Sequence, residues 1–450
     1  MRILFKDVDV IVTFDQKGRE LINAWLLVDG TRISSLGSEE PPVNQVDEVI
    51  DCRGKIMIPG MVNLHHHMYQ SLFRCVPDVQ NAPLFKWLTY LYEKWKNIDE
   101  EAVYISTIIA CTELLRSGCT LTSDHLYLFP PNSEHFIDAQ VEAARKVGIR
   151  FYVTRGSMSL SKEQGGLPPR EVVQTEEQIL DDSERVILKY HDSSPGAMVR
   201  VALAPCSPFS VTERLMLETA KLAHRYKVLL HTHLAETIDE ERFCKEKFKC
   251  RPVEYLRRVG WLSHNVWVAH LIHVQEEEIL ELAKAKVGVA HCPSSNMITG
   301  AGIAPVATML DYGVSVGLGV DGSSANDMSN IIREARQAML LARIKDGPEA
   351  MSARQALQLA TVGGAKVLHW DDELGTLEPG KCADITLFQT NGFEWAGVVD
   401  PVAGLIRCDV NKADLVMVNG QILIKNSELV QGELHELLEN HRMRTKQLNH

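Results

Sequence analysis

The chain has 450 residues, of which 45% are hydrophobic and 24% are charged, and its formal net charge is −12. This composition is typical of a soluble globular protein, and the acidic balance argues against a nucleic-acid partner, because phosphate contacts need a basic face. Residues 1–15 alternate like a strand and include Asp7, so we expect no signal peptide. No apolar stretch is long enough to cross a bilayer. We therefore expect a cytoplasmic protein without a membrane partner.

The first predicted unit in chain order is a set of short strands. Residues 1–55 contain alternating runs at Asp9–Phe14, Ala24–Val28 and Arg32–Leu36, separated by turn residues. The pattern returns at Ala383–Phe388 and Leu415–Leu423. We expect both ends of the chain to form one small β-sandwich, with residues 1–58 as its first part and residues 381–426 as its second. Residues 427–450 are predicted to form a C-terminal helix.

Between these segments, strand and helix patterns alternate. Helical periods occur at residues 138–147, 176–190, 212–226 and 276–286. Near-continuous apolar strands separated by helices indicate a parallel sheet, and eight such units predict an α/β fold with a (β/α)8, TIM-like barrel, which we assign to residues 59–380. The eight apolar runs are Ile56–Val62, Cys119–Ser123, Ile149–Thr154, Val199–Ala204, Val228–His231, Val266–Ala269, Val287–Ala290 and Val314–Val320.

The ten cysteines are dispersed and form no Cys-x-x-Cys pair. Several lie in apolar runs, as Cys119 does, which is typical of reduced, buried cysteine. The sequence therefore predicts neither a disulfide framework nor a zinc finger.

Polar or reactive side chains follow each of the eight runs. In a barrel of this type the active site forms at the carboxyl ends of the strands. One such histidine would be unremarkable as a structural residue, but repetition around a ring indicates a site. The residues are His65 and His67, Asp124 and His125, Arg155, Cys206, His231 and His233, His270, His291, and Asp321.

The histidines after the first run have the spacing of metal ligands. In an extended segment, residues i and i+2 point to the same side, so His65 and His67 can face one point while His66 faces away. The triplet alone could equally be an incidental surface cluster. Together with His233 and Asp321, however, it supplies three imidazoles and one carboxylate, a set that suits Zn²⁺ or Fe²⁺ with one position left for water.

The motifs at the strand ends occur in a fixed order. They are Pro59-Gly60, Asn63-x-His65-x-His67, His233-x-x-Glu236, Ala269-His270, His291-Cys292-Pro293, Asp321-Gly322-Ser323, and Gly375-x-Leu377-x-x-Gly380-Lys381-x-Ala383-Asp384. This series resembles the amidohydrolase superfamily over essentially the whole chain. Many members bind two metals bridged by a carboxylated lysine on the fourth strand. The fourth run here has no lysine, so the resemblance implies the mononuclear, deaminase-type branch with one divalent metal, zinc or alternatively iron.

Within that branch, several segments are similar to the 8-oxoguanine deaminase family, with the s-triazine hydrolases as relatives. The resemblance implies hydrolytic deamination of an oxopurine, 8-oxoguanine, to urate and ammonia. The alternatives are amino- or chlorohydrolysis of an s-triazine of the hydroxyatrazine type, and deamination of guanine or a pterin. The similar segments are residues 65–70, 81–88, 155–159, 165–169 and 204–210.

For the catalytic step we expect two proton-transfer groups and one orienting group. Glu236 is predicted to protonate the ring nitrogen beside the attacked carbon, and Asp321, also a ligand, to accept the proton of the attacking water. His270 is expected to orient that water and stabilise developing charge. Assistance of this kind supplies roughly 10²–10⁴-fold in rate.

Substrate contacts are expected from Gln70, Trp87 and Arg155. An amide offers a paired donor and acceptor, an indole can stack, and a guanidinium can donate to a ring carbonyl. Core packing is the alternative for Trp87, and a structural ion pair is the alternative for Arg155. His125 and His291 could line the pocket or support a ligand by hydrogen bonding, and Asn296 and Asp327 have no assigned role.

A non-enzymatic reading is also open, because some barrels of the superfamily serve as assembly proteins after losing their ligands. All four expected ligands are present here, together with Glu236 and His270, which favours the enzyme. By resemblance we further expect a homo-oligomer, a dimer or larger.

Overall fold

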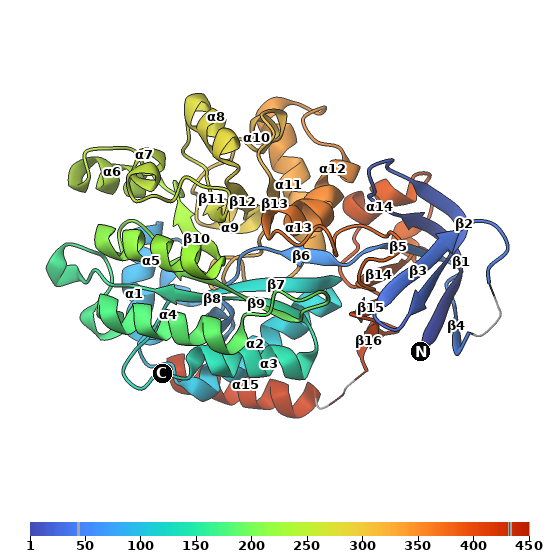
Figure 1. The fold of residues 1–450 in the computed structure, drawn as a ribbon, viewed down its shortest axis with the longest axis horizontal. Coiled ribbons are helices and arrows are strands. Elements are labelled where there is room, and N and C mark those ends of the chain that lie inside the picture. Colours follow the sequence, from blue (N-terminus) through green and yellow to red (C-terminus); the bar gives the residue numbers. More distant parts are fainter. Residues whose placement is uncertain (43–45, 431, 433, 450) are drawn as a thin grey trace.

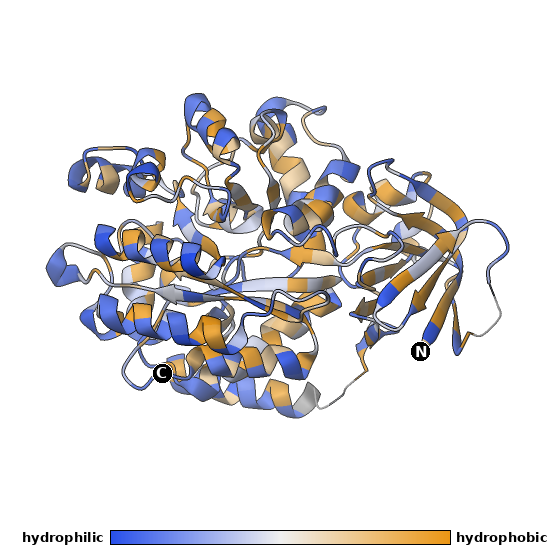
Figure 2. Cartoon of the chain, viewed as in Figure 1, coloured by the Kyte–Doolittle hydropathy of each residue, from blue (hydrophilic) through white to orange (hydrophobic). Residues whose placement is uncertain are grey.

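The computed structural model describes the chain except residues 43–45, 431, 433 and 450. The described chain forms a closed barrel and a separate mixed sheet beside it (Figure 1). Hydrophobic residues dominate the strands of the mixed sheet, whereas hydrophilic residues cover much of the helices around the barrel (Figure 2). None of the described helices is both long and apolar enough to cross a bilayer.

The barrel has eight parallel strands, as the sequence predicts. Each strand pairs with the next in chain order, and the last closes the ring by pairing Leu318 with Asn63. All eight strands are almost entirely buried, which explains their continuous apolar character. They are β6 (Met61–Asn63), β7 (Cys119–Leu126), β8 (Arg150–Ser157), β9 (Val199–Pro205), β10 (Leu229–Leu234), β11 (Val266–His270), β12 (Gly288–His291) and β13 (Val316–Leu318).

Helices cover the outside of this barrel. The capping residues Thr175 and Thr212, whose side chains accept main-chain N–H bonds, fix where α4 and α5 begin. The helices are α1 (Leu84–Trp95), α2 (Glu100–Arg116), α3 (Phe136–Val147), α4 (Glu176–Tyr190), α5 (Glu213–Tyr226), α6 (Ile238–Lys247), α7 (Pro252–Arg258), α8 (Glu276–Ala285), α9 (Pro293–Ile298), α10 (Val306–Asp311), α11 (Ile331–Asp346), α12 (Ala353–Gln358) and α13 (Gly364–Val367).

Both ends of the chain build the mixed sheet. Its path runs β17-β16-β15-β14-β5-β1-β2-β3, with β4 beside β1, and the antiparallel pairing of β5 with β14 joins the two ends. The strands are β1 (Arg2–Val12), β2 (Glu20–Asp29), β3 (Arg32–Gly37), β4 (Glu48–Asp51), β5 (Lys55–Pro59), β14 (Ile385–Gln389), β15 (Leu415–Val418), β16 (Gln421–Lys425) and β17 (Glu428–Leu429), and α14 (Pro401–Arg407) lies between β14 and β15.

The first apolar run, expected to be a single barrel strand, is divided between the two sheets. Lys55–Pro59 forms β5 of the mixed sheet, and Met61–Asn63 forms β6 of the barrel. Gly60 lies at the transition, where a Cβ atom would come within 2.1 Å of Thr120 Oγ1. Only glycine fits this close approach, so the chain can pass from one sheet to the other there.

The C-terminal helix α15 (Leu434–Asn449) packs beside α2 and reaches the segment that follows the histidine triplet. His441 Nε2 lies 3.0 Å from Ser71 Oγ, and Asn449 donates to the main-chain oxygen of Leu72. Ser71 and Leu72 belong to the short helix η1 (Met68–Phe73). The end of the chain therefore stabilises the loop that presents His65 and His67.

Candidate active site

The four residues expected to bind metal meet at the carboxyl end of the barrel. His65 and His67 follow β6, His233 lies on β10, and Asp321 follows β13. Asp321 Oδ1 is 3.4 Å from His65 Nε2 and 3.3 Å from His67 Nε2, and the Nε2 atoms of His67 and His233 are 3.2 Å apart. All four side chains are buried. Residues as distant as 65 and 321 thus converge on one point.

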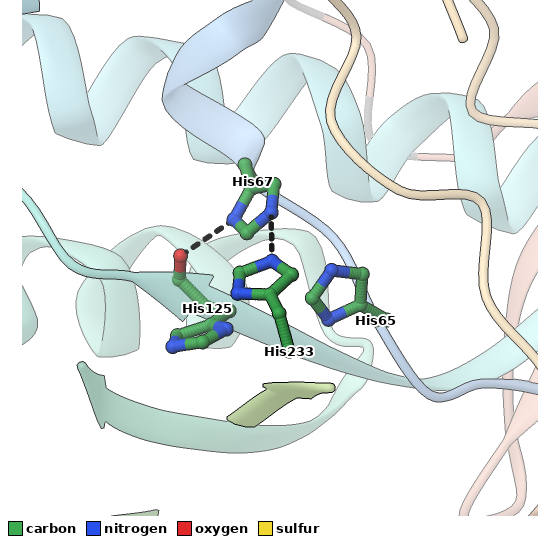
Figure 3. A group of neighbouring side chains, drawn as sticks. All are labelled: His65, His67, His125 and His233. Carbon is green, nitrogen blue, oxygen red and sulfur yellow. Dashed lines mark hydrogen bonds between the residues drawn. The ribbon is translucent and has the colours of Figure 1, made fainter. Parts of the chain in front are cut away.

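Backbone carbonyls fix the protonation of two of these histidines, and Figure 3 shows the contact of His67 with the carbonyl of His125. His67 Nδ1 lies 2.7 Å from the main-chain oxygen of His125, and His233 Nδ1 lies 2.6 Å from that of Cys206. A carbonyl only accepts, so each Nδ1 bears the proton. Burial lowers the pKa of His67 and lowers that of His233 to about 3, so both rings are neutral. Their facing Nε2 atoms therefore both present lone pairs, an arrangement that a cation between them would stabilise.

His65 is held in the same protonation state through another histidine. His231 Nδ1 donates to the main-chain oxygen of Trp267, at 3.0 Å, so His231 Nε2 accepts from His65 Nδ1, at 2.8 Å. His65 Nε2 is left with a lone pair and makes no hydrogen bond within the described part of the chain. Three imidazole lone pairs and a carboxylate oxygen thus face one another, and this donor set fits a divalent ion such as zinc or iron.

The supporting role of His231 was not predicted. The spacing of His231 and His233 places both side chains on the same face of a strand. The spacing does not reveal which of the two histidines lies beside Asp321. His125 supports two ligands: its carbonyl orients His67, and its ring stacks on that of His233 at a centroid distance of 4.8 Å. His125 Nε2 itself donates to the main-chain oxygen of Ala204. These contacts match the hydrogen-bonded alternative that the sequence left open.

The two remaining predicted catalytic groups lie beside the ligands. His270 Nε2 is 3.8 Å from both Glu236 Oε2 and Asp321 Oδ2, and His270 Nδ1 is 3.0 Å from Asn296 Oδ1. Burial raises the pKa of Glu236, which favours a carboxyl able to hold a proton. His270 and Asp321 have φ angles of 73° and 64°, and such left-handed conformations of non-glycine residues concentrate at functional sites.

A buried carboxylate that the sequence analysis missed holds Glu236 in place. Glu240 accepts the main-chain N–H groups of Ala235, at 2.8 Å, and of Glu236, at 2.9 Å. Burial raises its pKa to about 7. Glu240 lies four residues beyond Glu236, in the first turn of α6, so it can bond back to the main chain that presents the Glu236 carboxyl.

A second buried carboxylate connects two strand ends. Glu334 on α11 accepts from the main-chain N–H of Ser294, at 3.1 Å, and from Asn326 Nδ2, at 2.9 Å. Asn326 also donates to the main-chain oxygen of Val320, next to Asp321. The loops after β12 and β13 are therefore joined through one side chain.

Of the other residues named from sequence, Asp327 has a hydrogen-bond partner, whereas Nδ1 of His291 has none in the described part of the chain. Asp327 accepts the main-chain N–H of Cys75, at 2.9 Å, and joins the loop after β13 to the segment after η1. His291 is buried at the end of β12 and does not line the cavity described next.

A cavity opens beside the four predicted metal ligands His65, His67, His233 and Asp321, which we call the ligand group. Its empty volume is about 430 Å³, including the mouth. One wall of the cavity is apolar and is formed by residues of α1 and by Phe209. The polar part of the lining comes from the predicted ligands and catalytic residues. Of the predicted substrate contacts, Gln70 and Trp87 line the cavity. The lining residues are His67, Gln70, Leu84, Trp87, Leu88, Tyr92, Tyr127, Cys206, Phe209, His233, Glu236, His270, Ser295, Thr299, Asp321 and Ala325.

The prediction that Arg155 contacts substrate does not match its position. Arg155 is absent from the cavity wall, and its guanidinium pairs with Asp182 at 2.6 Å, donates to Gln174 at 2.8 Å, and covers the ring of Phe129 at 3.7 Å. Its donors are thus engaged within the protein. The structural ion pair, which the sequence left open as the alternative, is what the structure contains.

Comparison with known proteins agrees with this geometry. The model of the amidohydrolase family matches residues 56–423. The chain belongs to the amidohydrolase family. This amidohydrolase is therefore a hydrolase that acts on carbon–nitrogen bonds, as expected from its sequence, and several curated relatives are deaminases.

The relatives of this amidohydrolase act on different heterocycles. The chain is 44% identical to 8-oxoguanine deaminase from Pseudomonas aeruginosa, over 96% of both chains. It is 33% identical to hydroxydechloroatrazine ethylaminohydrolase from Pseudomonas sp. strain ADP, over 94% of this chain and 91% of that one. The solved structure of atrazine chlorohydrolase from Arthrobacter aurescens TC1 complexed with zinc matches with a TM-score of 0.93 and 35% identity, over 98% of this chain and 100% of that one.

Proposed function

We propose that this amidohydrolase converts 8-oxoguanine and water into urate and ammonia. The observation on which this rests is the 44% identity to an 8-oxoguanine deaminase over 96% of both chains. The geometry agrees with it, because a buried carboxyl, Glu236, lines a cavity beside a group of side chains that could hold a metal ion. A purine ring is flat and polar at its edge, and the cavity combines an apolar wall with polar groups.

In this proposal one divalent ion, zinc or iron, is bound by His65, His67, His233 and Asp321. When bound, such an ion lowers the pKa of a coordinated water to near ~7 and so supplies a nucleophile at neutral pH. The hydrogen bonds from the Nδ1 atoms serve to keep the three Nε2 lone pairs directed at the ion.

The proton transfers are assigned to the carboxyl groups. Glu236, whose pKa is raised by burial, gives a proton to the ring nitrogen next to the attacked carbon and makes that carbon more electrophilic. Asp321 accepts the proton of the attacking water. His270 lies 3.8 Å from both carboxylates and orients the water between them. Ammonia leaves after receiving a proton from the same groups.

Substrate positioning is assigned to Gln70 and Trp87. Gln70 Oε1 accepts the main-chain N–H of Ser324, at 3.2 Å, and Gln70 Nε2 donates one hydrogen to Tyr69 Oη, at 3.4 Å. The second N–H of Nε2 is assigned to a ring carbonyl of the substrate. Trp87 belongs to the apolar wall, where an indole can pack against a flat ring.

A substrate panel tests the proposal. The purified protein is incubated with 8-oxoguanine, guanine, isoxanthopterin, hydroxyatrazine and atrazine, and release of ammonia, alkylamine or chloride is measured. We expect rapid ammonia release from 8-oxoguanine, with urate detected as its absorbing product. Turnover of a triazine alone would contradict the proposal.

Triazine hydrolysis is the second candidate. It is favoured by the similarity to atrazine chlorohydrolase, whose TM-score of 0.93 spans nearly the whole of both chains. The same panel distinguishes the two functions, because an alkylated triazine releases an alkylamine or chloride and an oxopurine releases ammonia.

A further inference from the structure

Two residues that line the cavity carry a buried hydroxyl group without a hydrogen-bond partner among the described residues. They belong to Tyr92, on α1, and Ser295, on α9, and each residue is only 1% exposed. Within the described residues neither hydroxyl donates or accepts a hydrogen bond. Most buried polar groups in proteins are paired, so each exception calls for an explanation.

The Tyr92 hydroxyl remains protonated inside the protein. Burial raises the pKa of Tyr92 well above its usual value, so the group is both a donor and an acceptor at neutral pH. Its ring packs against Trp95 at a centroid distance of 5.8 Å. A phenylalanine would keep this packing and avoid the cost of an unpaired hydroxyl, so packing alone does not account for tyrosine.

Ser295 lies next to the residue that hydrogen-bonds His270. Asn296, the following residue, bonds to His270, so α9 borders the reacting end of the cavity. Ser294, the preceding residue, also has a buried, unpaired hydroxyl, but Ser294 does not line the cavity. The chain thus provides a matched pair of neighbouring serines, of which only Ser295 lines the cavity.

We propose that Tyr92 and Ser295 are specificity-determining residues that hydrogen-bond the polar edge of the substrate ring. An oxo- and N–H-bearing bicycle can pair with both hydroxyls, whereas an N-alkyl group would leave them unpaired and buried. Leaving a buried polar group unpaired disfavours the wrong ligand strongly. The proposal rests on the proposed function and adds to it the reason for preferring an oxopurine to an N-alkylated triazine.

The test compares four single variants. Tyr92→Phe and Ser295→Ala remove the proposed contacts. Tyr255→Phe and Ser294→Ala are their controls, because each also removes a buried, unpaired hydroxyl, but outside the cavity wall. We expect Tyr92→Phe and Ser295→Ala each to lower kcat/KM for 8-oxoguanine roughly 10-fold or more, mainly through a higher KM. Both controls should stay within about 2-fold of the wild type, as should all four variants with hydroxyatrazine if it is turned over.

A binding measurement separates this proposal from the proposed function. Urate is titrated into the wild type and the four variants by calorimetry, and we expect a roughly 10-fold weaker Kd only for Tyr92→Phe and Ser295→Ala. If the wild type fails to deaminate 8-oxoguanine but this binding difference is present, the proposed function is wrong and the recognition role stands. Wild-type values of Kd and KM in both variants, or equal losses in their controls, would overturn the recognition role alone.

Discussion

The ligand group and the α1 wall of the cavity differ in the hydrogen bonds that the protein makes to their side chains. Each ligand histidine has its Nδ1 engaged by a carbonyl or by His231. At the α1 wall, by contrast, the Tyr92 hydroxyl makes no hydrogen bond within the described chain. In the first region the protein fixes each histidine ring through Nδ1 and leaves Nε2 for an ion. In the second region it leaves a buried hydroxyl without a partner among the described residues. The comparison suggests that the chemistry is set by the ligand group and the choice of substrate by the wall.

The largest effect is expected from the catalytic carboxyl. Glu236→Gln removes the group proposed to protonate the ring, so kcat should fall roughly 10²–10⁴-fold while the protein keeps its metal. Steady-state kinetics and elemental analysis of the same sample measure both quantities. A variant with the wild-type rate would show that Glu236 is not the proton donor.

The next effect tests whether the ligand group is organised by hydrogen bonding. His231→Phe keeps the ring that stacks on Trp267 at 4.4 Å but removes the acceptor for His65. We expect metal affinity to weaken roughly 10–100-fold, measured by competition with a chelator. His369→Phe, outside the cavity, is the control. Equal affinities for His231→Phe and the wild type would mean that His65 needs no such support.

A smaller loss of activity is expected when the hydrogen bonds between Glu240 and the main chain at Glu236 are disturbed. Glu240→Gln replaces one of two acceptors by a donor that faces a main-chain N–H, so Glu236 should shift and kcat should fall roughly 10-fold with KM unchanged. Asp239→Asn, on the more exposed side of the same helix, is the matched control. A change in KM alone would place Glu240 in substrate binding instead.

The smallest effect on activity is expected for Arg155. Arg155→Leu removes one of the two arginines that pair with Asp182, which keeps its contact with Arg185 at 2.7 Å, and it removes the donor to Gln174. The free energy of unfolding should therefore fall by roughly 1–3 kcal/mol. KM should remain near the wild-type value, because Arg155 does not line the cavity. Denaturant unfolding and kinetics on the folded fraction measure the two quantities. A raised KM with unchanged stability would restore Arg155 as a substrate contact.

Much of the barrel and the convergence of its four expected ligands could be predicted because both depend on local periodicity. Alternation along a strand places His65 and His67 on one side, and parallel strands bring their ends together. The division of the first run at Gly60 could not be predicted, since an apolar run looks the same in either sheet. The partners of Arg155 and Glu334 were also hidden, because Asp182 and Ser294 are separated from them by 27 and 40 residues and no spacing rule connects them.

The central claim is that His65, His67, His233 and Asp321 bind one divalent ion. Elemental analysis of the purified wild type and of His67→Ala tests it directly. We predict about one zinc or iron per wild-type chain and close to none in the variant, with both proteins folded by circular dichroism. Two ions per wild-type chain, or one ion retained by His67→Ala, would contradict the claim.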